Sequence, residues 1–354
     1  MLAADSKLVS SPTTDTLNNG PVYSWKQIID PVEPFLEAVS RRLAKQVEAF
    51  DSNLSPYADY ALNGQGKHLR PALVALTANA LGNVNEEHIT VAVIIEMVHL
   101  ATLVHDDVMD EAEIRRGQLT VAANWGNEIA VLFGDCLFAR ALALAAGFPT
   151  PEICRAVALA TNTVCSGEIL QTQHRCDFNF TRDKYFKVLE MKTAELFALS
   201  CGLSAFLSGA PPDHRAALRA FGMAFGTAYQ VYDDCLDLFG SETSGGKSLG
   251  TDLTKGKLTL PVLLVLERAE PADRARLQNL IRNWQPASLK SLGKLLAKYD
   301  ALEASLEFMR DYLLQARRLL VALPPSDGRA SLLSLTDHLA RQTDRLGMVS
   351  ETSL

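Results

Sequence analysis

Two short acidic clusters interrupt stretches of sequence that are otherwise apolar. Asp106-Asp107-Val108-Met109-Asp110 follows the segment Leu100–His105, and Asp233-Asp234-Cys235-Leu236-Asp237 lies between Tyr229–Tyr232 and Leu238-Phe239. On a helix, the first and last aspartates of each cluster are four residues apart and share a face. Three carboxylates within one turn repel one another, and burying them in an apolar setting is costly unless a cation compensates. A solvated acidic face is the alternative, and the apolar flanks disfavour it.

The rest of the chain has the pattern of helices nearly throughout. From about Trp25 onward, Ala, Leu and Glu are frequent and apolar residues recur at intervals of three and four. Helix breakers separate these stretches: Asn63-Gly64, Gly82-Asn83, Gly147-Phe148-Pro149, Gly209–Pro212, Gly240–Gly250 and Leu323-Pro324-Pro325. We expect no β-strands, because no convincing alternating pattern occurs. The sequence predicts an all-α protein.

Two of the expected helices are apolar on all sides, which is typical of central helices surrounded by others. They are Ile89–Val104 and Ala194–Leu207. A single large domain over residues 21–354 is therefore expected, preceded by a flexible tail over residues 1–20 that is rich in Ser, Thr, Asp and Asn. Ile89–Val104 and Ile129–Phe148 each contain charged or titratable residues, so we predict no membrane span.

Composition excludes some functions. The chain has 34 Lys+Arg against 41 Asp+Glu, a net charge of −7, and non-specific nucleic-acid binding needs a basic face instead. Six cysteines without a CxxC pair predict reduced thiols in an intracellular protein, and we expect a cytoplasmic location. The N-terminus shows no signal-peptide pattern.

Basic residues lie close to the acidic clusters in the sequence. Arg115-Arg116-Gly117 follows the first cluster, and Gly245-Gly246-Lys247 and Lys255-Gly256-Lys257 follow the second. Each motif alone is typical of an ordinary charged surface, but their placement favours an anion site. Helical oxygen ligands favour Mg²⁺, which prefers a few carboxylates together with substrate phosphates. Two facing clusters would thus hold a bridged diphosphate or triphosphate.

Other basic side chains fit the same site. Lys67 and Arg70 are three residues apart near an expected helix start, and Lys192-Thr193 lies in an apolar helix. His99 precedes Asp106 by seven residues, on nearly the same helical face, and can reach the same cavity.

Taken together, these residues resemble the trans-polyprenyl diphosphate synthases, in particular the long-chain, octaprenyl- or solanesyl-like members. The first motif of that family appears as Glu96–Asp110 with Arg115-Arg116-Gly117, and the second as Tyr229–Gly240. The order of motifs matches from about Gly66 to Pro261. The resemblance implies mostly antiparallel helices around a deep central cavity, usually in a homodimer. One departure is Gln65 at a position where members of the family often carry Gly.

The resemblance also implies a reaction. An allylic diphosphate would ionise with the help of Mg²⁺, and the double bond of isopentenyl diphosphate would attack the resulting cation. The roles of the individual residues are implied in the same way. About three Mg²⁺ would be held by Asp106, Asp110, Asp233 and Asp237, and Asp107 and Asp234 would complete the catalytic clusters. The allylic diphosphate would be bound by Arg115, Lys192, Lys247 and Lys257, and isopentenyl diphosphate by Lys67, Arg70, His99 and Arg116, with Thr193 and Gln230 near the cation.

The resemblance gives an expectation for product length as well. In the family, a bulky aromatic residue four or five positions before the first cluster closes the cavity. Here those positions are Thr102 and Ala101, which predicts a long product of roughly six or more isoprene units that would need release into a membrane. The alternative is a floor made by another helix, around Ile169, Leu170 and Phe197.

Four other interpretations remain open at this point. The chain could be a short-chain (farnesyl or geranylgeranyl) diphosphate synthase, or a condensing or cyclising terpenoid enzyme. His105-Asp106 also resembles the helical HD-type metal phosphohydrolases, which leaves the second cluster unexplained. A non-catalytic synthase subunit would have lost aspartates that this chain keeps.

Overall fold

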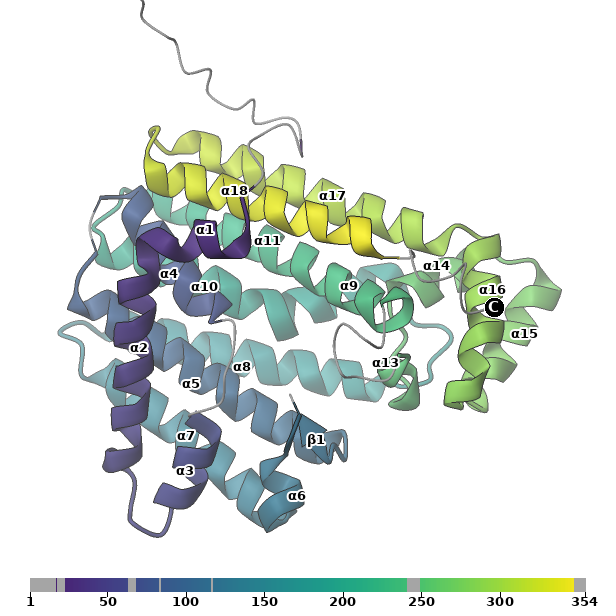
Figure 1. Cartoon of the computed structure of the whole chain (residues 1–354), viewed down its shortest axis with the longest axis horizontal. Helices are drawn as coiled ribbons and strands as arrows, with labels where there is room; N and C mark the ends of the chain where they lie inside the picture. The colour runs from purple at the N-terminus through teal and green to yellow at the C-terminus, as the bar shows by residue number, and fades with distance from the viewer. Residues whose placement is uncertain are drawn as a thin grey trace, which may run out of the picture.

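Helices make up nearly all of the described chain, which confirms the all-α prediction (Figure 1). The computed structural model describes residues 17, 23–62, 68–82, 84–115, 117–240 and 249–346. Its α-helices are α1 (Trp25–Ile29), α2 (Glu33–Gln46), α3 (Ser55–Leu62), α4 (Leu69–Ala80), α5 (Glu86–Met109), α6 (Val121–Trp125), α7 (Asn127–Ala146), α8 (Pro151–Gln173), α9 (Arg182–Leu189), α10 (Glu195–Leu207), α11 (Pro212–Phe239), α13 (Thr251–Thr254), α14 (Leu260–Arg268), α15 (Pro271–Arg282), α16 (Leu289–Lys298), α17 (Ala301–Leu319) and α18 (Asp327–Gln342). The π-helical segment η3 (Glu190–Ala194) joins α9 to α10.

The expected helix breakers that the structure describes coincide with helix ends, whereas Asn63, Gly64, Asn83 and residues 241–248 lie outside the described residues. α4 ends before Gly82 and α10 before Gly209, and both glycines adopt a positive φ, of 76° and 69°. This left-handed conformation is available to glycine at little cost and turns the chain out of the helix. At the next start, the side chain of Asn85 caps α5 by accepting hydrogen bonds from the backbone N–H groups of Glu87 and His88.

The two helices expected to be central are central. α5 packs against α4, α7 and α10, and α10 packs in turn against α4 and α11. Figure 1 shows α17 and α18 running across one side of this layer, with α15 and α16 at the far end. The core is therefore formed by helices whose side chains are apolar around most of their circumference.

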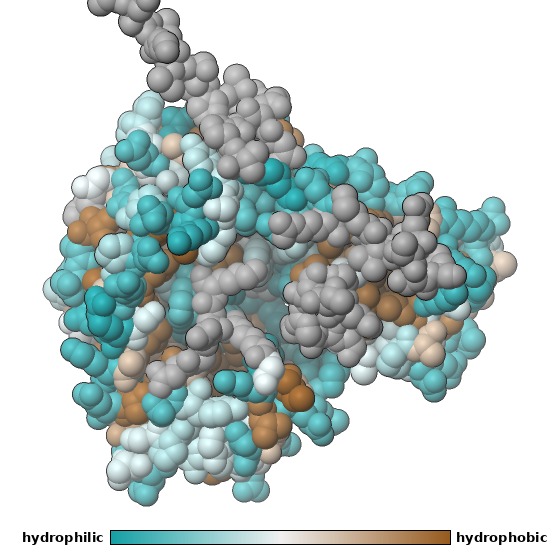
Figure 2. All heavy atoms as spheres, viewed as in Figure 1, coloured by the Kyte–Doolittle hydropathy of each residue, from teal (hydrophilic) through white to brown (hydrophobic). Residues whose placement is uncertain are grey.

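A small hairpin departs from the expectation of no strands. β1 (Ile114–Arg115) pairs antiparallel with β2 (Gln118–Leu119). Two residues per strand are too few to show an alternating pattern in the sequence. The hydroxyl of Tyr60 donates a 2.6 Å hydrogen bond to the backbone oxygen of Leu119, which ties the hairpin to α3. In Figure 2, apolar side chains reach the surface near this hairpin, where Ile114 is 65% exposed.

Two helices, α5 and α7, are long and apolar enough to cross a membrane by length and composition. The most apolar part of α5 is 56% buried inside the molecule and that of α7 is 33% buried. Central helices of soluble proteins pass the same test, so this is weak evidence, and the absence of a membrane span stays a prediction.

Candidate functional site

The first acidic cluster lies at the C-terminal end of α5. Asp106 and Asp107 are in its last turn, and Asp110 is the residue that ends it. Carboxylates are unfavourable there, because the helix dipole already places partial negative charge at a C-terminus. The side chains of Asp106 and Asp107 are only 18% and 7% exposed, so water offsets little of their charge. The cluster needs cations from other elements.

Two basic side chains reach the aspartates in the last turn. Arg115 Nε from β1 lies 2.7 Å from Asp107 Oδ1, and Lys192 Nζ from η3 lies 3.5 Å from Asp106 Oδ2. Both are residues for which the resemblance implies binding of the allylic diphosphate. Guanidinium and ammonium donors that hold a carboxylate have the chemistry needed to hold a phosphate.

Asp110 has cations on both of its carboxylate oxygens. Lys257 Nζ lies 2.6 Å from Oδ2, and Arg175 Nη2 lies 2.8 Å from Oδ1. Lys255 donates a hydrogen bond to the backbone oxygen of Asp110. Burial disfavours ionisation of Asp110, but the hydrogen bond and the charge of Lys257 outweigh it and lower the pKa.

At Asp106, the effect of burial on the pKa outweighs that of the nearby positive charge. Burial raises its pKa to about 6; the Lys192 ammonium opposes this shift, and the neighbouring Glu168 carboxylate adds to it. Lys192 pairs with Glu168 as well as with Asp106, and it donates a 3.0 Å hydrogen bond to Gln171 Oε1. One lysine thus serves two carboxylates, and the negative charge here is incompletely compensated.

A π-helical turn places Lys192 and Thr193 in the site. η3 inserts one wider turn between α9 and α10, and such turns are frequent at functional sites. Two glycines allow neighbouring helices to approach it. A Cβ on Gly167 of α8 would lie 2.8 Å from the backbone nitrogen of Lys192, and a Cβ on Gly226 of α11 would lie 2.8 Å from Ala194 Cα. The turn is held between two helices that pack at backbone distance.

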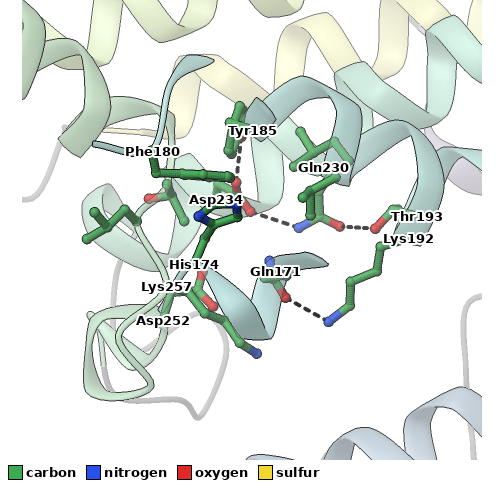
Figure 3. Close-up of a pocket in the computed structure, with 14 residues that line it drawn as sticks. Gln171, His174, Phe180, Tyr185, Lys192, Thr193, Gln230, Asp234, Asp252 and Lys257 are labelled. Atoms are coloured by element: carbon green, nitrogen blue, oxygen red, sulfur yellow. Dashed lines mark hydrogen bonds between the residues drawn. The ribbon is translucent and has the colours of Figure 1, made fainter. Parts of the chain in front are cut away.

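The second acidic cluster lies in the last turns of α11 and is held by neutral donors. Asp234 is 4% exposed and accepts hydrogen bonds from the Tyr185 hydroxyl, at 2.6 Å, and from Gln230 Nε2, at 2.8 Å. Gln230 Oε1 in turn accepts a 3.0 Å hydrogen bond from the Thr193 hydroxyl. Figure 3 shows this chain of contacts from η3 to α11. Burial raises the pKa of Asp234 well above its usual value.

Asp237, the last aspartate of the cluster, caps the four-residue helix α13. Its Oδ1 accepts hydrogen bonds from the backbone N–H and hydroxyl of Thr251, at 3.0 and 2.5 Å, and its Oδ2 accepts one from the backbone N–H of Asp252 at 3.2 Å. Burial raises the pKa of Asp252 to about 7, and the charges of Asp237 and Asp233 contribute to the shift. Three acidic side chains therefore repel one another at this end of α11.

Lys257 contacts the first cluster and a neighbour of the second. The side chain of Lys257 binds Asp110 of the first cluster, and its backbone N–H donates a 2.9 Å hydrogen bond to the backbone oxygen of Asp252, beside the second. Lys257, Lys192 and Asp234 line the same cavity, together with Thr193 and Gln230 (Figure 3). The face of the molecule shown in Figure 2 is hollowed near its centre, with hydrophilic side chains in the hollow. Two lysines that pair with the first cluster and one aspartate of the second thus line the same cavity, and the convergence of all the cluster aspartates on it stays a prediction.

The donors in this cavity suit a divalent cation that a substrate helps to hold. Among the described residues, no group of three His, Cys, Asp or Glu side chains is close enough to hold a metal ion on its own. The carboxyl groups of Asp106 and Asp252 are buried next to other acids, and both have raised pKa values. Mg²⁺ relieves such repulsion and usually completes its shell with water and phosphate oxygens rather than protein ligands.

A second, smaller cavity lies on another side of α5. Its lining includes His68, Glu96 and His99. His68 Nδ1 lies 3.5 Å from Glu96 Oε1. Burial opposes ionisation of Glu96, but the nearby His68, His99 and Arg70 side chains lower its pKa. The Arg70 guanidinium stacks on the Phe197 ring, with its carbon 4.8 Å from the ring centroid. Two of the residues predicted to bind isopentenyl diphosphate thus share one electrostatic cluster.

The residues predicted to set product length lie just before the first cluster on α5. Ala101 is completely buried, and the hydroxyl of Thr102 is turned back onto the backbone oxygen of His99 at 2.6 Å. Of the alternative floor residues, Ile169 is 59% exposed and Phe197 is 1% exposed. The role of these residues stays a prediction.

Three of the predicted binding residues, Lys67, Arg116 and Lys247, lie outside the described residues. Four side chains of the site were not predicted from the sequence: Glu168, Arg175, Tyr185 and Asp252. Glu168 lies in α8, which also carries Glu152, Arg155 and several neutral polar residues, so its charge does not distinguish it in the sequence. Arg175 and Asp252 lie in polar segments, where nothing distinguishes a site residue from a surface one.

Comparison with known proteins agrees with this geometry. A family model described as "Polyprenyl synthetase" matches residues 51–298. The octaprenyl diphosphate synthase of Escherichia coli (strain K12) is 32% identical over 314 residues, which is 88% of this chain and 96% of that protein. The short chain isoprenyl diphosphate synthase of Methanothermobacter thermautotrophicus is 30% identical over 318 residues, 88% of this chain and 98% of that protein.

A solved structure matches as well. It is that of a polyprenyl synthase from Caulobacter crescentus CB15, described as complexed with calcium and isoprenyl diphosphate. The TM-score is 0.84 at 32% sequence identity, and the match covers 91% of this chain and 98% of the other.

Proposed function

Because the chain belongs to the polyprenyl synthetase family, it is a prenyl transferase, and we propose that it condenses isopentenyl diphosphate with an allylic diphosphate, head to tail, into a trans-polyprenyl diphosphate. The observation that carries this proposal is one cavity lined by Lys192 and Lys257, which pair with the first cluster, and by Asp234 of the second, so a single diphosphate can reach both clusters. An HD-type phosphohydrolase would leave the second cluster without a role.

We propose that the allylic diphosphate binds between the clusters with Mg²⁺ held by Asp106, Asp110, Asp233 and Asp237. Bound Mg²⁺ would supply positive charge to the leaving diphosphate. The matched Caulobacter structure is described as complexed with calcium and isoprenyl diphosphate, which supports binding of a divalent cation together with a diphosphate. The number of ions, about three, follows from the family resemblance alone.

The chain's own cations would share in holding the leaving group. Lys192, Lys257 and Arg115 already pair with carboxylates of the first cluster, so each can move its donors to phosphate oxygens with little reorganisation. Lys247 is proposed for the same role. Charge that is already oriented when the C–O bond breaks stabilises the transition state more than charge that must be recruited.

We propose that Thr193 and Gln230 face the allylic cation. The Thr193 hydroxyl donates to Gln230 Oε1, and Gln230 donates to Asp234, so the orientation of both polar groups is fixed. An oriented oxygen dipole can stabilise a nearby cation without capturing it, and the apolar residues Leu189 and Leu258 of the same cavity help to exclude water.

Isopentenyl diphosphate is proposed to bind at Arg70 and His99, together with Lys67 and Arg116. Arg70 and His99 lie in the electrostatic cluster of Glu96, at the second cavity on α5. A separate cationic site for the second substrate is what a condensation of two diphosphates requires, because two anions must be bound at once.

For product length, we propose a long chain as the main function and a short chain as the second candidate. The octaprenyl relative supports the first and the short chain relative supports the second. The small side chains Ala101 and Thr102 favour the long product. Ala101→Phe is expected to shorten the product, and an unchanged length would place the floor on another helix.

We propose that the enzyme acts as a homodimer through α7 and α8. Four large apolar side chains on these helices are strongly exposed: Val131 41%, Leu132 61%, Leu159 61% and Ile169 59%. Leu132→Glu is expected to give a monomer by light scattering coupled to size exclusion. Val321→Glu, at a 53% exposed site remote in sequence, is the matched control and should leave the dimer intact.

A cytoplasmic location and a single domain over residues 21–354 belong to the same proposal. All six cysteines are free of disulfide bonds, which supports a reducing compartment.

The decisive experiment combines purified protein, Mg²⁺, labelled isopentenyl diphosphate and a series of allylic primers. The expected result is release of inorganic diphosphate with formation of a labelled prenyl product, whose length is read by chromatography. Release of inorganic phosphate from nucleotides, with no prenyl product from any primer, would overturn the proposal in favour of a phosphohydrolase.

A further inference from the structure

Arg175 behaves in the structure like the cations that are proposed to hold the allylic diphosphate. It lies in the turn directly after α8, in a segment that none of the sequence motifs includes. Its Nη2 lies 2.8 Å from Asp110 Oδ1, while Lys257 Nζ lies 2.6 Å from Oδ2 of the same carboxylate. Arg115 and Lys192 hold the other two aspartates of this cluster. Arg175 therefore completes a set of four cations around the first cluster.

The backbone fixes Arg175 beside the loop that carries Lys257. The N–H of Cys176 donates a 2.8 Å hydrogen bond to the backbone oxygen of Gly256. Both residues adopt a positive φ, 57° at Cys176 and 70° at Gly256, and a Cβ on Gly256 would lie 2.6 Å from Cys176 Sγ. The two segments are packed too closely to slide past one another, so Arg175 and Lys257 keep their positions relative to each other.

The Arg175 guanidinium has donor capacity to spare. Its side chain is 26% exposed, and its Nε is buried without a hydrogen-bond partner among the described residues. An arginine presents its donors in a planar fork that matches two oxygens of a phosphate group. The buried Nε of Arg175 lacks an acceptor among the described residues and lies beside a second cation, Lys257, and this arrangement is unfavourable unless an anion supplies the acceptor.

We propose that Arg175 is a further binding residue for the allylic diphosphate, acting beside Lys257. The inference rests on the proposed function. When a divalent cation takes the oxygens of Asp110, the carboxylate charge that holds Arg175 is neutralised, and the guanidinium needs another anion within reach. The diphosphate bound at the same carboxylate is that anion, and both Nη2 and Nε can donate to it.

Binding of inorganic diphosphate in the presence of MgCl₂, measured by isothermal titration calorimetry, tests this assignment. Arg175→Gln is expected to raise the dissociation constant about 10-fold or more, as the loss of a charge-assisted contact does. Arg175→Lys keeps the charge but not the fork and should fall in between. Arg182→Gln is the matched control, because Arg182 lies nearby in the sequence but pairs with Glu267, and it should bind like the wild type.

The thermal unfolding midpoint of each variant separates binding from bracing of the turn. A dissociation constant for Arg175→Gln within twofold of the wild-type value, while Lys257→Gln binds weakly, would overturn the assignment. So would a Lys variant that is as weak as the Gln variant and equally destabilised, because Arg175 would then only hold the turn in place. A wild-type chain that binds magnesium diphosphate but forms no prenyl product would instead refute the proposed function and leave the role of Arg175 intact.

Discussion

The two acidic clusters share a sequence pattern but are held in different ways. Cations surround the first: Arg115, Arg175, Lys192 and Lys257 all pair with its aspartates. The hydrogen bonds described for the second come from neutral groups: Tyr185 and Gln230 donate to Asp234, and Thr251 donates to Asp237. The first cluster thus brings charge for a substrate anion, and the second keeps acidic charge that a metal ion can neutralise.

The middle aspartates show what the clusters have in common. Asp107 and Asp234 are both buried, and both accept short hydrogen bonds from another element. The first and last aspartates of each cluster are four residues apart and share a helical face. In each cluster, therefore, the middle aspartate is fixed by a contact to a different element from its own helix.

The largest expected effect comes from removing an outer aspartate. Asp106→Asn and Asp233→Asn should each lower kcat by roughly 100- to 1,000-fold or more, because each removes a proposed ligand of the Mg²⁺ whose positive charge would stabilise the departing diphosphate. Steady-state kinetics with a fixed primer measures this effect. Asp273→Asn, at a carboxylate that pairs with Lys298 in α15 and α16, is the control. Loss of activity in only one of the two cluster variants would show that the clusters do not share a ligand.

The π-helical turn is the next test, since it carries Lys192, which pairs with Asp106 of the first cluster. Gly167→Ala would place a methyl group 2.8 Å from the backbone nitrogen of Lys192, so η3 must shift. A displacement of about 1 Å can cost about 100-fold in rate. Gly293→Ala on α16, where nothing lies within 4 Å of the new methyl group, is the matched control. It should keep full activity and gain about 0.5–1 kcal/mol of stability.

These glycines also show where prediction from sequence ends. The helices, their ends and the two aspartate clusters could be predicted, because periodicity, breakers and carboxylates in apolar surroundings are local signals. The π turn could not, since it depends on Gly167 and Gly226 in two other helices meeting the same backbone. The same holds for Asp252, which lies in a polar loop and matters only because α11 brings Asp237 next to it.

The basic side chains of the site divide in the same way, into some that local sequence reveals and one that it does not. Lys192 and Lys257 follow from motifs close to a cluster or in an apolar helix. Arg175 is 65 residues from Asp110, its partner, in a turn whose composition resembles that of any surface turn. Its place in the site is set by the packing of Cys176 on Gly256, which no local pattern records.

The pH dependence of stability should distinguish the clusters further. The pKa of Asp106 is about 6 in the folded chain, against an ordinary value of 3.8. The folded state therefore binds this proton more tightly, and the contribution of Asp106 to stability is most favourable at low pH. It declines as the pH rises from about 4 to about 6, by on the order of 1–3 kcal/mol.

Urea unfolding at pH 4 and pH 7 measures that contribution as a difference between the wild type and Asp106→Asn. The asparagine variant cannot titrate at this position, so it should lose less stability over the interval than the wild type does. For Asp110→Asn the effect has the opposite sign and lies below about pH 4, because cations lower the pKa of Asp110, so this variant should follow the wild type between pH 4 and pH 7. Equal pH profiles for the wild type and Asp106→Asn would contradict the electrostatic description of the first cluster.

The smallest expected effect is the salt dependence of the stability lost in two variants. Tyr185→Phe removes the hydroxyl that donates to Asp234 at 2.6 Å, and we expect a loss of about 1–2 kcal/mol in the free energy of unfolding, since a buried carboxyl group loses one hydrogen bond. Arg115→Gln removes a charge whose side chain is 33% exposed. Added salt screens exposed charge but not a buried neutral contact. The loss in free energy of unfolding caused by Arg115→Gln should therefore be smaller at high salt than at low salt, whereas the loss caused by Tyr185→Phe should stay constant. Urea unfolding at both ionic strengths measures both losses. A salt-dependent cost for Tyr185→Phe would mean that the second cluster, too, is held by charge.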